Sequence, residues 1–394
     1  MPSNESTKSA SMVSYESAGV SIEKGDEAVE LLAPLAKSTY NKNVLAGVGG
    51  FAALYELEKD QYRNPVLVSA TDGIGTKLEL AKVASQFDTV GYDLVAMVLD
   101  DLACTGAKPL FMLDYVSVGK LNPKVVEVLV GGIAKAAKEC DCVLIGGETA
   151  EHPGVSKEDE IDVAGFAVGV VEKDQMWGSH KVKLGDTLIG LESPNARSNG
   201  FSLIRTVFAD YLRDWQNGGE PEPVHWDSKG RNLLQILLEP SVLYTPVLKD
   251  SVVRTGIRAA AHITGGGLLG NLKRVIPQNL SAEVIRHSWS IPEIFVEVSR
   301  FDYGIPPSNG NPTSTAVNIG INGIDFSARS RPTLPPRSTI AVAKRIDPQL
   351  QRLNPLLERV KHPYLLRLPL RPRSPPLRAI PLSCRLRRGP WILF

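Results

Sequence analysis

The sequence predicts an α/β protein of the α+β type, with two domains followed by an irregular tail. Three observations support this prediction. The chain has 394 residues, more than one domain ordinarily holds. Short β-branched runs alternate with amphipathic helical patterns as far as about residue 295. The composition, with 43% hydrophobic and 22% charged residues, is that of a globular protein and excludes a collagen-like or wholly disordered chain.

The first predicted domain covers residues 13–172, after a polar N-terminus at 1–12 that we expect to be flexible. A helical pattern begins near Gly25, and a glycine-rich loop follows at Gly47–Gly50. A turn is expected at Thr71-Asp72-Gly73, where the first strand ends. Strands are predicted at 66–70, 110–118, 142–145 and 161–171, and further helices at 90–104 and 124–138, the second entered through Asn122-Pro123.

The second predicted domain covers residues 173–327. Its elements in order are a strand at 187–191, a helix from Phe201, a loop at 215–230, a largely helical segment at 233–248, and a helix after the glycine-rich run 264–267. The tail, 328–394, has a proline every few residues. We therefore expect neither a strand nor a long helix there.

Charge separates the tail from the rest of the chain. Residues 328–394 hold 15 basic and 2 acidic residues, a net charge of +13, and 12 of the 28 prolines. The remainder has a net charge of −12. Because an acidic surface repels phosphates, nucleic acid is not expected as a ligand of the body and is possible only for the tail.

Other features limit the cellular context. No apolar run reaches the length of a membrane span, and no secretory signal is present. Cys104, Cys140, Cys142 and Cys384 form neither a CxxC pair nor a zinc-binding pattern. We therefore expect a cytoplasmic protein without membrane association.

A set of carboxylates stands at predicted strand and helix ends. Carboxylate oxygens at such positions suit Mg²⁺, which proteins often share with substrate phosphates. The alternative is that these residues cap helices and make turns; for Asp72 alone the two interpretations are balanced, and the whole set favours a metal. The set is Asp72, Asp93, Asp100, Asp101, Asp114 and Glu148.

Three glycine-rich loops are candidates for phosphate binding, because consecutive glycine N–H groups can point at one anion. They are Gly47–Gly50, Gly73–Lys77 and Thr264–Gly267, with Lys77 offering a positive charge. None has the Walker or Rossmann spacing. Each loop alone is more simply a turn, but together they predict a nucleotide site of another design.

Two further groups are candidate ligands. His262 precedes the third loop and could bind an anion or transfer a proton; the alternative is a packed, hydrogen-bonded histidine. Arg197-Ser198-Asn199-Gly200 precedes a predicted helix, where Ser198 or Asn199 could instead be a helix cap.

Several stretches, in this order, resemble one family. They are SYESAGVSIEKG from Ser14, GVGGF from Gly47, VLVSATDGIGTKL from Val66, DDLACTGAKPLFMLDY from Asp100, GGETAEHPG from Gly146, SNGFSLIR from Ser198 and AHITGGGLLGNLKRVIP from Ala261. The chain from about Ser14 to about Phe295 is similar to the phosphoribosylformylglycinamidine cyclo-ligase family, also called aminoimidazole ribonucleotide synthetases.

The resemblance implies a fold and an activity. It implies two domains, each with a mixed sheet and helices, and a homodimer in which strands of the N-terminal domain form a shared barrel. It implies ATP-dependent ring closure of formylglycinamidine ribonucleotide in purine biosynthesis, with Mg²⁺ and often K⁺. The implied mechanism is phosphorylation of the formyl oxygen, attack by the amidine-side nitrogen and departure of phosphate.

The resemblance also implies roles for particular residues. Asp72, Lys77 and His262 are the candidate catalytic residues, and Asp72, Asp101 and Glu148 the candidate ligands of the metal or triphosphate. Gly47, Gly49, Gly50, Gly73, Gly75 and Thr76 would bind the nucleotide, and Ser198, Asn199, Thr264, Gly265 and Gly266 the ribonucleotide substrate.

The chain departs from the family pattern at a few positions. Arg197 stands where the family often has His, and Arg cannot act as a base at neutral pH. Any proton transfer there would then be lost or pass to His262. Asp100 replaces a common Asn, and His152 a common Met.

The tail is the largest departure from the family pattern. It admits two interpretations, and the function has an alternative within the same superfamily. Residues 328–394 resemble a frame-shifted or poorly predicted translation; the other interpretation is a genuine basic extension that docks on the acidic body or on nucleic acid. An inactive chain whose basic tail binds polyanions is an alternative to the enzyme. A small-molecule kinase, such as a thiamine-phosphate kinase or a selenophosphate synthetase, is a neighbouring possibility. GGETAE and SNGFSL favour the cyclo-ligase.

Overall fold

The computed structural model describes residues 21–186, 188–220, 222–250, 254, 256–282 and 292–300, and three short strands at 340–343, 371–372 and 392–393. The predictions for the N-terminus 1–12 and for most of the tail lie outside the described residues.

A four-stranded mixed sheet organises the first part of the chain. The strand order is β3-β6-β4-β5, with β6 antiparallel to both β3 and β4, and β4 parallel to β5. The strands are β3 (Pro65–Gly73), β4 (Lys108–Val118), β5 (Val143–Glu151) and β6 (Ile161–Glu172). All four predicted strands are confirmed. The predicted barrel would be formed by strands of two copies of the chain, and it stays a prediction.

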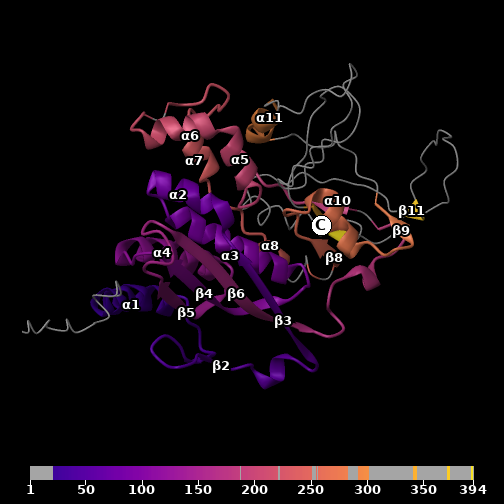
Figure 1. Cartoon of the computed structure of the whole chain (residues 1–394). Helices are drawn as coiled ribbons and strands as arrows, with labels where there is room; N and C mark the ends of the chain where they lie inside the picture. Colours follow the sequence, from indigo (N-terminus) through magenta and orange to yellow (C-terminus); the bar gives the residue numbers. More distant parts are fainter. Residues whose placement is uncertain are drawn as a thin grey trace, which may run out of the picture.

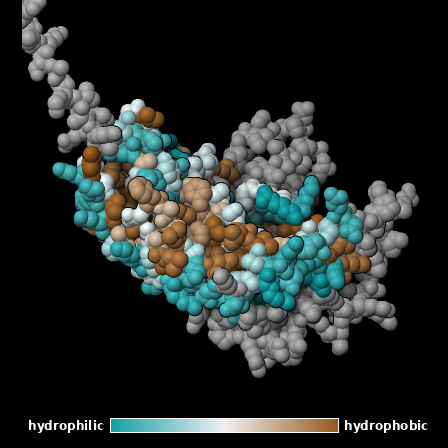
Figure 2. All heavy atoms as spheres, turned by 90° about the horizontal axis from the view of Figure 1, so that it is seen from below, coloured by the Kyte–Doolittle hydropathy of each residue, from teal (hydrophilic) through white to brown (hydrophobic). Residues whose placement is uncertain are grey.

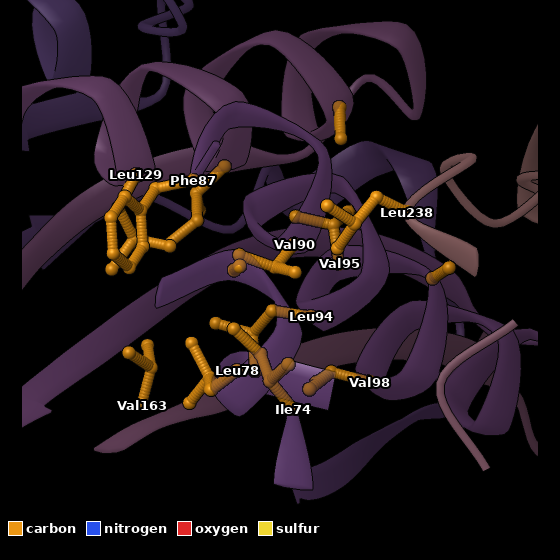
Figure 3. Packing of buried hydrophobic residues seen from close by; sticks show 14 of the residues in the cluster. Ile74, Leu78, Phe87, Val90, Leu94, Val95, Val98, Leu129, Val163 and Leu238 are labelled. Atoms are coloured by element: carbon orange, nitrogen blue, oxygen red, sulfur yellow. The ribbon is translucent and has the colours of Figure 1, made fainter. Parts of the chain in front are cut away.

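Helices α1 (Ile22–Lys37), α3 (Asp88–Ala103) and α4 (Pro123–Glu139) lie on one side of this sheet (Figure 1). Asn122 caps α4 by accepting a hydrogen bond from the Lys124 N–H, as the Asn-Pro entry predicted. Leu94 and Val98 of α3 pack beside Ile74 and Leu78, in the main hydrophobic cluster (Figure 3). The packing of α3 against the sheet fixes the positions of the carboxylates that α3 carries.

One predicted turn is wrong. Asp72 and Gly73 belong to β3, where Asp72 pairs with Gly165 and Gly73 with Ala164 of β6. Residues 146–149 extend β5 beyond the predicted strand 142–145. Both segments have turn-like composition, but neighbouring strands supply the hydrogen bonds that keep them extended.

The opposite face of the sheet is open among the described residues. Leu67 on β3, Phe166 on β6 and Tyr115 on β4 are 65%, 46% and 37% exposed. Apolar atoms gather at the centre of the surface in the view from below the sheet (Figure 2). Three large apolar side chains are thus exposed on a face that would ordinarily carry polar residues.

A second small sheet has the order β12-β7-β10-β8, and α10 (Gly267–Val275) belongs to the hydrophobic cluster around it. Its strands are β7 (Leu188–Gly190), β8 (Ile257–Ala261), β10 (Ile340–Ala343) and β12 (Ile392–Leu393). The expectation that residues 328–394 form no strand is therefore wrong for β10, β12 and β11 (Arg371–Pro372). Ile340–Ala343 is a proline-free apolar run, and it pairs with β7 and β8.

Helices α5 (Phe201–Val207), α6 (Ala209–Gln216), α7 (Leu233–Leu237) and α11 (Glu293–Arg300) contribute buried residues to the same cluster as α3. The predicted helical segment 233–248 is only partly helical, since it breaks between α7 and α8 (Thr245–Leu248). Pro240 lacks an N–H, and carboxylates of α3 accept hydrogen bonds from Ser241, Tyr244 and Thr245 instead. The domain boundary at 172/173 stays a prediction.

Candidate active site

Two adjacent carboxylates near the C-terminal end of α3 have opposite environments. Asp100 is 1% exposed, whereas the side chain of Asp101 is 48% exposed. Successive helix residues point about 100° apart, so one carboxylate faces the protein interior and the other faces outward.

Asp101 begins a connected chain of four side chains. Its Oδ1 is 2.8 Å from Nδ1 of His262, which follows β8. Nε2 of His262 is 3.2 Å from a terminal guanidinium nitrogen of Arg197. The same nitrogen donates to Asp100 Oδ2 at 2.9 Å. These contacts connect Asp101 to its neighbour Asp100 on α3 through the side chains of His262 and Arg197.

Both carboxylate oxygens of Asp100 accept hydrogen bonds from protein groups. Its Oδ1 accepts hydrogen bonds from the Tyr244 and Thr245 N–H groups and from the Thr245 hydroxyl, at 2.9–3.0 Å. These contacts favour the capping interpretation for Asp100 over metal binding, because α8 begins at Thr245.

Lys77 is likewise buried, with its ammonium bonded to protein groups. Its side chain is fully buried and forms an ion pair of 2.5 Å with Asp93. The ammonium also donates to the carbonyls of Arg197 and Glu239, at 3.0 and 3.1 Å. With its three donors used inside the protein, Lys77 is placed to join the Gly73–Lys77 loop to the following module rather than to contact a phosphate.

A cavity of about 410 Å³ opens beside Asp101 and His262. Thr71 of β3 and Asn271 and Arg274 of α10 also line it. The lining thus combines a half-exposed carboxylate, an imidazole and a guanidinium, which is a suitable set for a small anionic ligand.

Asp72 lies close enough to this group to feel its charge. Burial raises the pKa of the Asp72 carboxyl. The hydrogen bond that this carboxyl accepts from the Gly73 N–H lowers the pKa, and the negative charge of Asp101 raises it. A bound divalent cation would relieve the repulsion that the charge of Asp101 exerts on the Asp72 carboxylate.

Glu148 is separate from that group. It pairs in register with Tyr115, whose side chain is on the open face of the sheet, and it lines a different cavity of about 300 Å³. In the described residues, no three His, Cys, Asp or Glu side chains are grouped so that they could hold a metal ion together. The chain alone therefore does not assemble the predicted set Asp72, Asp101 and Glu148.

The loop Gly47–Gly50 lies on the side of that second cavity, which Val48 lines together with Glu148. Tyr40 donates a hydrogen bond to the Ile145 carbonyl and accepts one from the Val48 N–H, and its ring leaves no room for a side chain at residue 47. Gly49 has φ +109°, a conformation that favours glycine. Local geometry thus explains Gly47 and Gly49.

The other two loops lie side by side with the Arg197–Gly200 turn. Thr76 Oγ1 is 3.1 Å from Ser202 Oγ, and the Ser198 hydroxyl donates to the Ile74 carbonyl at 2.8 Å. Asn199 Nδ2 donates to Met97 Sδ at 3.4 Å, and its Oδ1 lies beside Gly265. The structure thus joins the loop of Gly73, Gly75 and Thr76 to the segment 198–202 through Ile74 and Thr76, and it places Asn199 beside Gly265 of the third loop.

Asp114 is a candidate that sequence reasoning did not carry into its final set. It lines the 300 Å³ cavity, and burial raises the pKa of its carboxyl to about 7. Its Oδ1 lies over Gly147, where any side chain would collide with it. An aspartate at an inward position of an apolar strand is the signal that could have identified it.

Every helix in the described part of the chain is too short or too polar to cross a bilayer.

Comparison with known proteins agrees with this architecture. Residues 49–171 match the family model for the N-terminal domain of AIR synthase related proteins, and residues 183–306 match the model for the C-terminal domain. A thiamine-monophosphate kinase from Stenotrophomonas maltophilia has a similar fold, with a TM-score of 0.55 at 20% identity, over 87% of this chain and 94% of that one.

Curated relatives give a closer match. The phosphoribosylformylglycinamidine cyclo-ligase of Thermoanaerobacter pseudethanolicus is 45% identical over 288 residues, which are 73% of this chain and 83% of the relative. That of a Polaromonas species is 47% identical over 289 residues, 73% of this chain and 81% of the relative. The chain therefore belongs to the phosphoribosylformylglycinamidine cyclo-ligase family, a family of enzymes.

Proposed function

We propose that this chain catalyses the ATP-dependent ring closure of formylglycinamidine ribonucleotide to aminoimidazole ribonucleotide, a step of purine biosynthesis. The observation that carries the proposal is that Asp101 and His262 line one cavity, with Asp72 near enough for the charge of Asp101 to raise its pKa, within a chain of this family. ATP would phosphorylate the formyl oxygen, the amidine-side nitrogen would attack the formyl carbon, and phosphate would leave as the ring closes.

Phosphoryl transfer needs positioning and neutralised charge more than covalent chemistry from the protein. Asp72 and Asp101 fit a Mg²⁺ ion, because they are neighbouring oxygen donors whose mutual repulsion a cation would relieve. Two carboxylates suffice where substrate phosphates complete the coordination. When bound, the ion supplies positive charge that stabilises the phosphates. Glu148 would contact the nucleotide from the second cavity.

The loops would position the two substrates. The loop of Gly73, Gly75 and Thr76 contacts the segment 198–202 through the bonds of Ile74 and Thr76, so the predicted nucleotide loop and the predicted substrate turn are neighbours. Gly265 lies beside Asn199, and its loop, with Thr264 and Gly266, would contact the ribonucleotide phosphate. Arg274, which lines the 410 Å³ cavity, adds a cation for that phosphate.

His262 has both ring nitrogens in hydrogen bonds to protein groups. We therefore assign it to holding Asp101 in place rather than to moving a proton to or from the substrate. Lys77 is likewise assigned to holding the loop that carries Thr76.

We also propose a homodimer that covers the open sheet face. Leu67, Tyr115 and Phe166 expose a contiguous apolar surface on neighbouring strands, and such a surface in water is typically covered by a partner. A second copy is the occupant that the family resemblance implies.

A reducing, cytoplasmic location is part of the proposal. Among the described residues, Cys104, Cys140 and Cys142 are all free thiols, as expected where disulfides do not persist.

The test is an assay with the purified full chain, the amidine ribonucleotide, ATP and Mg²⁺. We expect ADP and the aminoimidazole product in equal amounts by mass spectrometry. ADP formed with thiamine phosphate, and none with the amidine, would instead identify a kinase of the same superfamily. No turnover with any of these substrates would overturn the proposal.

A further inference from the structure

We propose that Arg197 is a positioning residue, which fixes the tautomer of His262 and, through it, the orientation of Asp101. The ring of His262 then donates a hydrogen bond to Asp101 and keeps this carboxylate at the 410 Å³ cavity. The inference rests on the proposed function, in which Asp101 binds the metal–triphosphate.

The first step is the direction of the bond between Arg197 and His262. A guanidinium has only donors, so the His262 nitrogen 3.2 Å away must accept. That nitrogen, Nε2, therefore carries no proton. The ring proton is then on Nδ1, which donates to Asp101 Oδ1 at 2.8 Å. The other neutral tautomer would put two donors against each other at Nε2 and two acceptors at Nδ1.

The second step is that Arg197 cannot turn away. Its side chain is fully buried and is paired with Asp100. It donates to the Val242 carbonyl at 2.8 Å, and its guanidinium lies 4.9 Å from the centre of the Tyr244 ring. Its backbone has φ +53°, and its N–H is held by the Asn195 side chain. A residue with so many fixed contacts imposes one hydrogen-bond direction on its neighbour.

The third step concerns Asp101. Its side chain is 48% exposed and would rotate freely if nothing held it. The bond from His262 uses Oδ1, and the described residues offer no hydrogen bond to Oδ2. One oxygen is thus held by the protein while the other is available to a ligand in the cavity. Hydrogen bonds that orient a ligating carboxylate in this way ordinarily contribute ~10–100-fold in metal affinity or activity.

The experiment compares the full-length wild type with the double variant Asp100→Asn/Arg197→Gln. Both residues are changed together, because removal of Arg197 alone would leave Asp100 charged and unpaired in the interior. The Gln side chain can donate or accept, so it no longer dictates the tautomer. Thermal unfolding of both proteins shows that the variant is folded.

The first readout is ¹⁵N NMR of histidine-labelled protein, with the His262 signals assigned by His262→Gln. We expect the wild type to show only the Nδ1–H tautomer. In the double variant Nε2 is free to carry the proton and the half-exposed Asp101 can turn away from Nδ1, so we expect a mixture. A folded double variant that keeps the single Nδ1–H tautomer would overturn the role of Arg197.

The second readout is calorimetric binding of a non-hydrolysable ATP analogue with Mg²⁺. We expect binding to weaken about tenfold in the double variant. We also expect His262→Asn, whose amide takes the place of Nδ1, to bind more tightly than His262→Gln. Equal binding by wild type and double variant, despite a changed tautomer, would overturn the role of Asp101.

These two readouts need no turnover. A wild type without ring-closing activity would therefore contradict the proposed function, while the tautomer measurement would still decide the role of Arg197.

Discussion

Lys77 and Asp93 form an ion pair in which both side chains are completely buried. Asp93 also accepts hydrogen bonds from the N–H and the hydroxyl of Ser241, and Lys77 reaches two carbonyls beyond the first sheet. Burial opposes the charge of each partner, lowering the pKa of Lys77 and raising that of Asp93, and each partner's charge works against that shift. Each buried charge therefore depends on the other for compensation.

Replacing Lys77 with Met should therefore destabilise the fold. We expect a loss of about 3–5 kcal/mol in the free energy of unfolding, because Asp93 would remain as an uncompensated buried carboxylate. Urea denaturation measures this loss. Lys124→Met is the control, since Lys124 forms only an exposed pair with Glu127, worth less than about 1 kcal/mol. Normal stability with lost activity would instead favour a direct contact between Lys77 and the nucleotide.

Asp72→Asn should affect turnover and not folding. We expect kcat to fall roughly 100-fold, as for a residue that helps to bind the metal–triphosphate, with the free energy of unfolding unchanged. Asp162→Asn is a matched control, because Asp162 lies on the open sheet face and accepts the same kind of hydrogen bond from the next N–H. Unchanged turnover with ATP and Mg²⁺ would remove Asp72 from the proposed site.

Asp114 should make stability depend on pH. Burial raises the pKa of its carboxyl to about 7, against about 3.9 in an unfolded chain. Between these values the folded chain holds a proton that the unfolded chain has released, so stability falls as pH rises from about 4 to about 7.

The comparison variant for this effect is Asp114→Asn, which carries no charge at any of these pH values. We expect it to gain stability over the wild type as pH rises, with about 4 kcal/mol as the upper bound above pH 7. Denaturant unfolding at several pH values provides the measurement. Parallel stability curves for the two proteins would show that the Asp114 carboxyl is solvated after all.

Phe166→Glu should weaken self-association. Phe166 is central on the open sheet face, between Thr71 and Leu113 on the neighbouring strands, and a charge there would have to be buried in the proposed dimer. Light scattering should show a dimer for the wild type and a monomer for the variant. Leu184→Glu, at an exposed leucine of a turn outside this sheet, should remain dimeric. A dimer that persists in Phe166→Glu would place the interface elsewhere.

Local sequence was sufficient for the elements that local forces determine. The helix α4 follows from its apolar spacing and from Asn122-Pro123, and β6 follows from its continuous apolar run. Asp101 and His262, which the family motifs singled out, line a common cavity although they are 161 residues apart in the chain. Their roles stay predictions.

The sequence was insufficient to predict the structure where partners far away in the chain determine a residue's conformation or exposure. Asp72 looks like a turn residue until the register with Gly165 keeps it extended. The segment around Pro240 looks helical until carboxylates of α3 capture its N–H groups. The predicted contact of Lys77 with phosphate depended on exposure, which Asp93 removes. Partners far away in the chain cannot be read from composition or periodicity.

Asp93 and Asp100 are seven residues apart, so two helical turns, or about 10 Å of rigid α3, separate their hydrogen bonds to residues 241–245. A segment held at two points of one rigid helix can turn only about the line that joins those points. The two attachments therefore restrain residues 241–245 from sliding along α3 or tilting away from it.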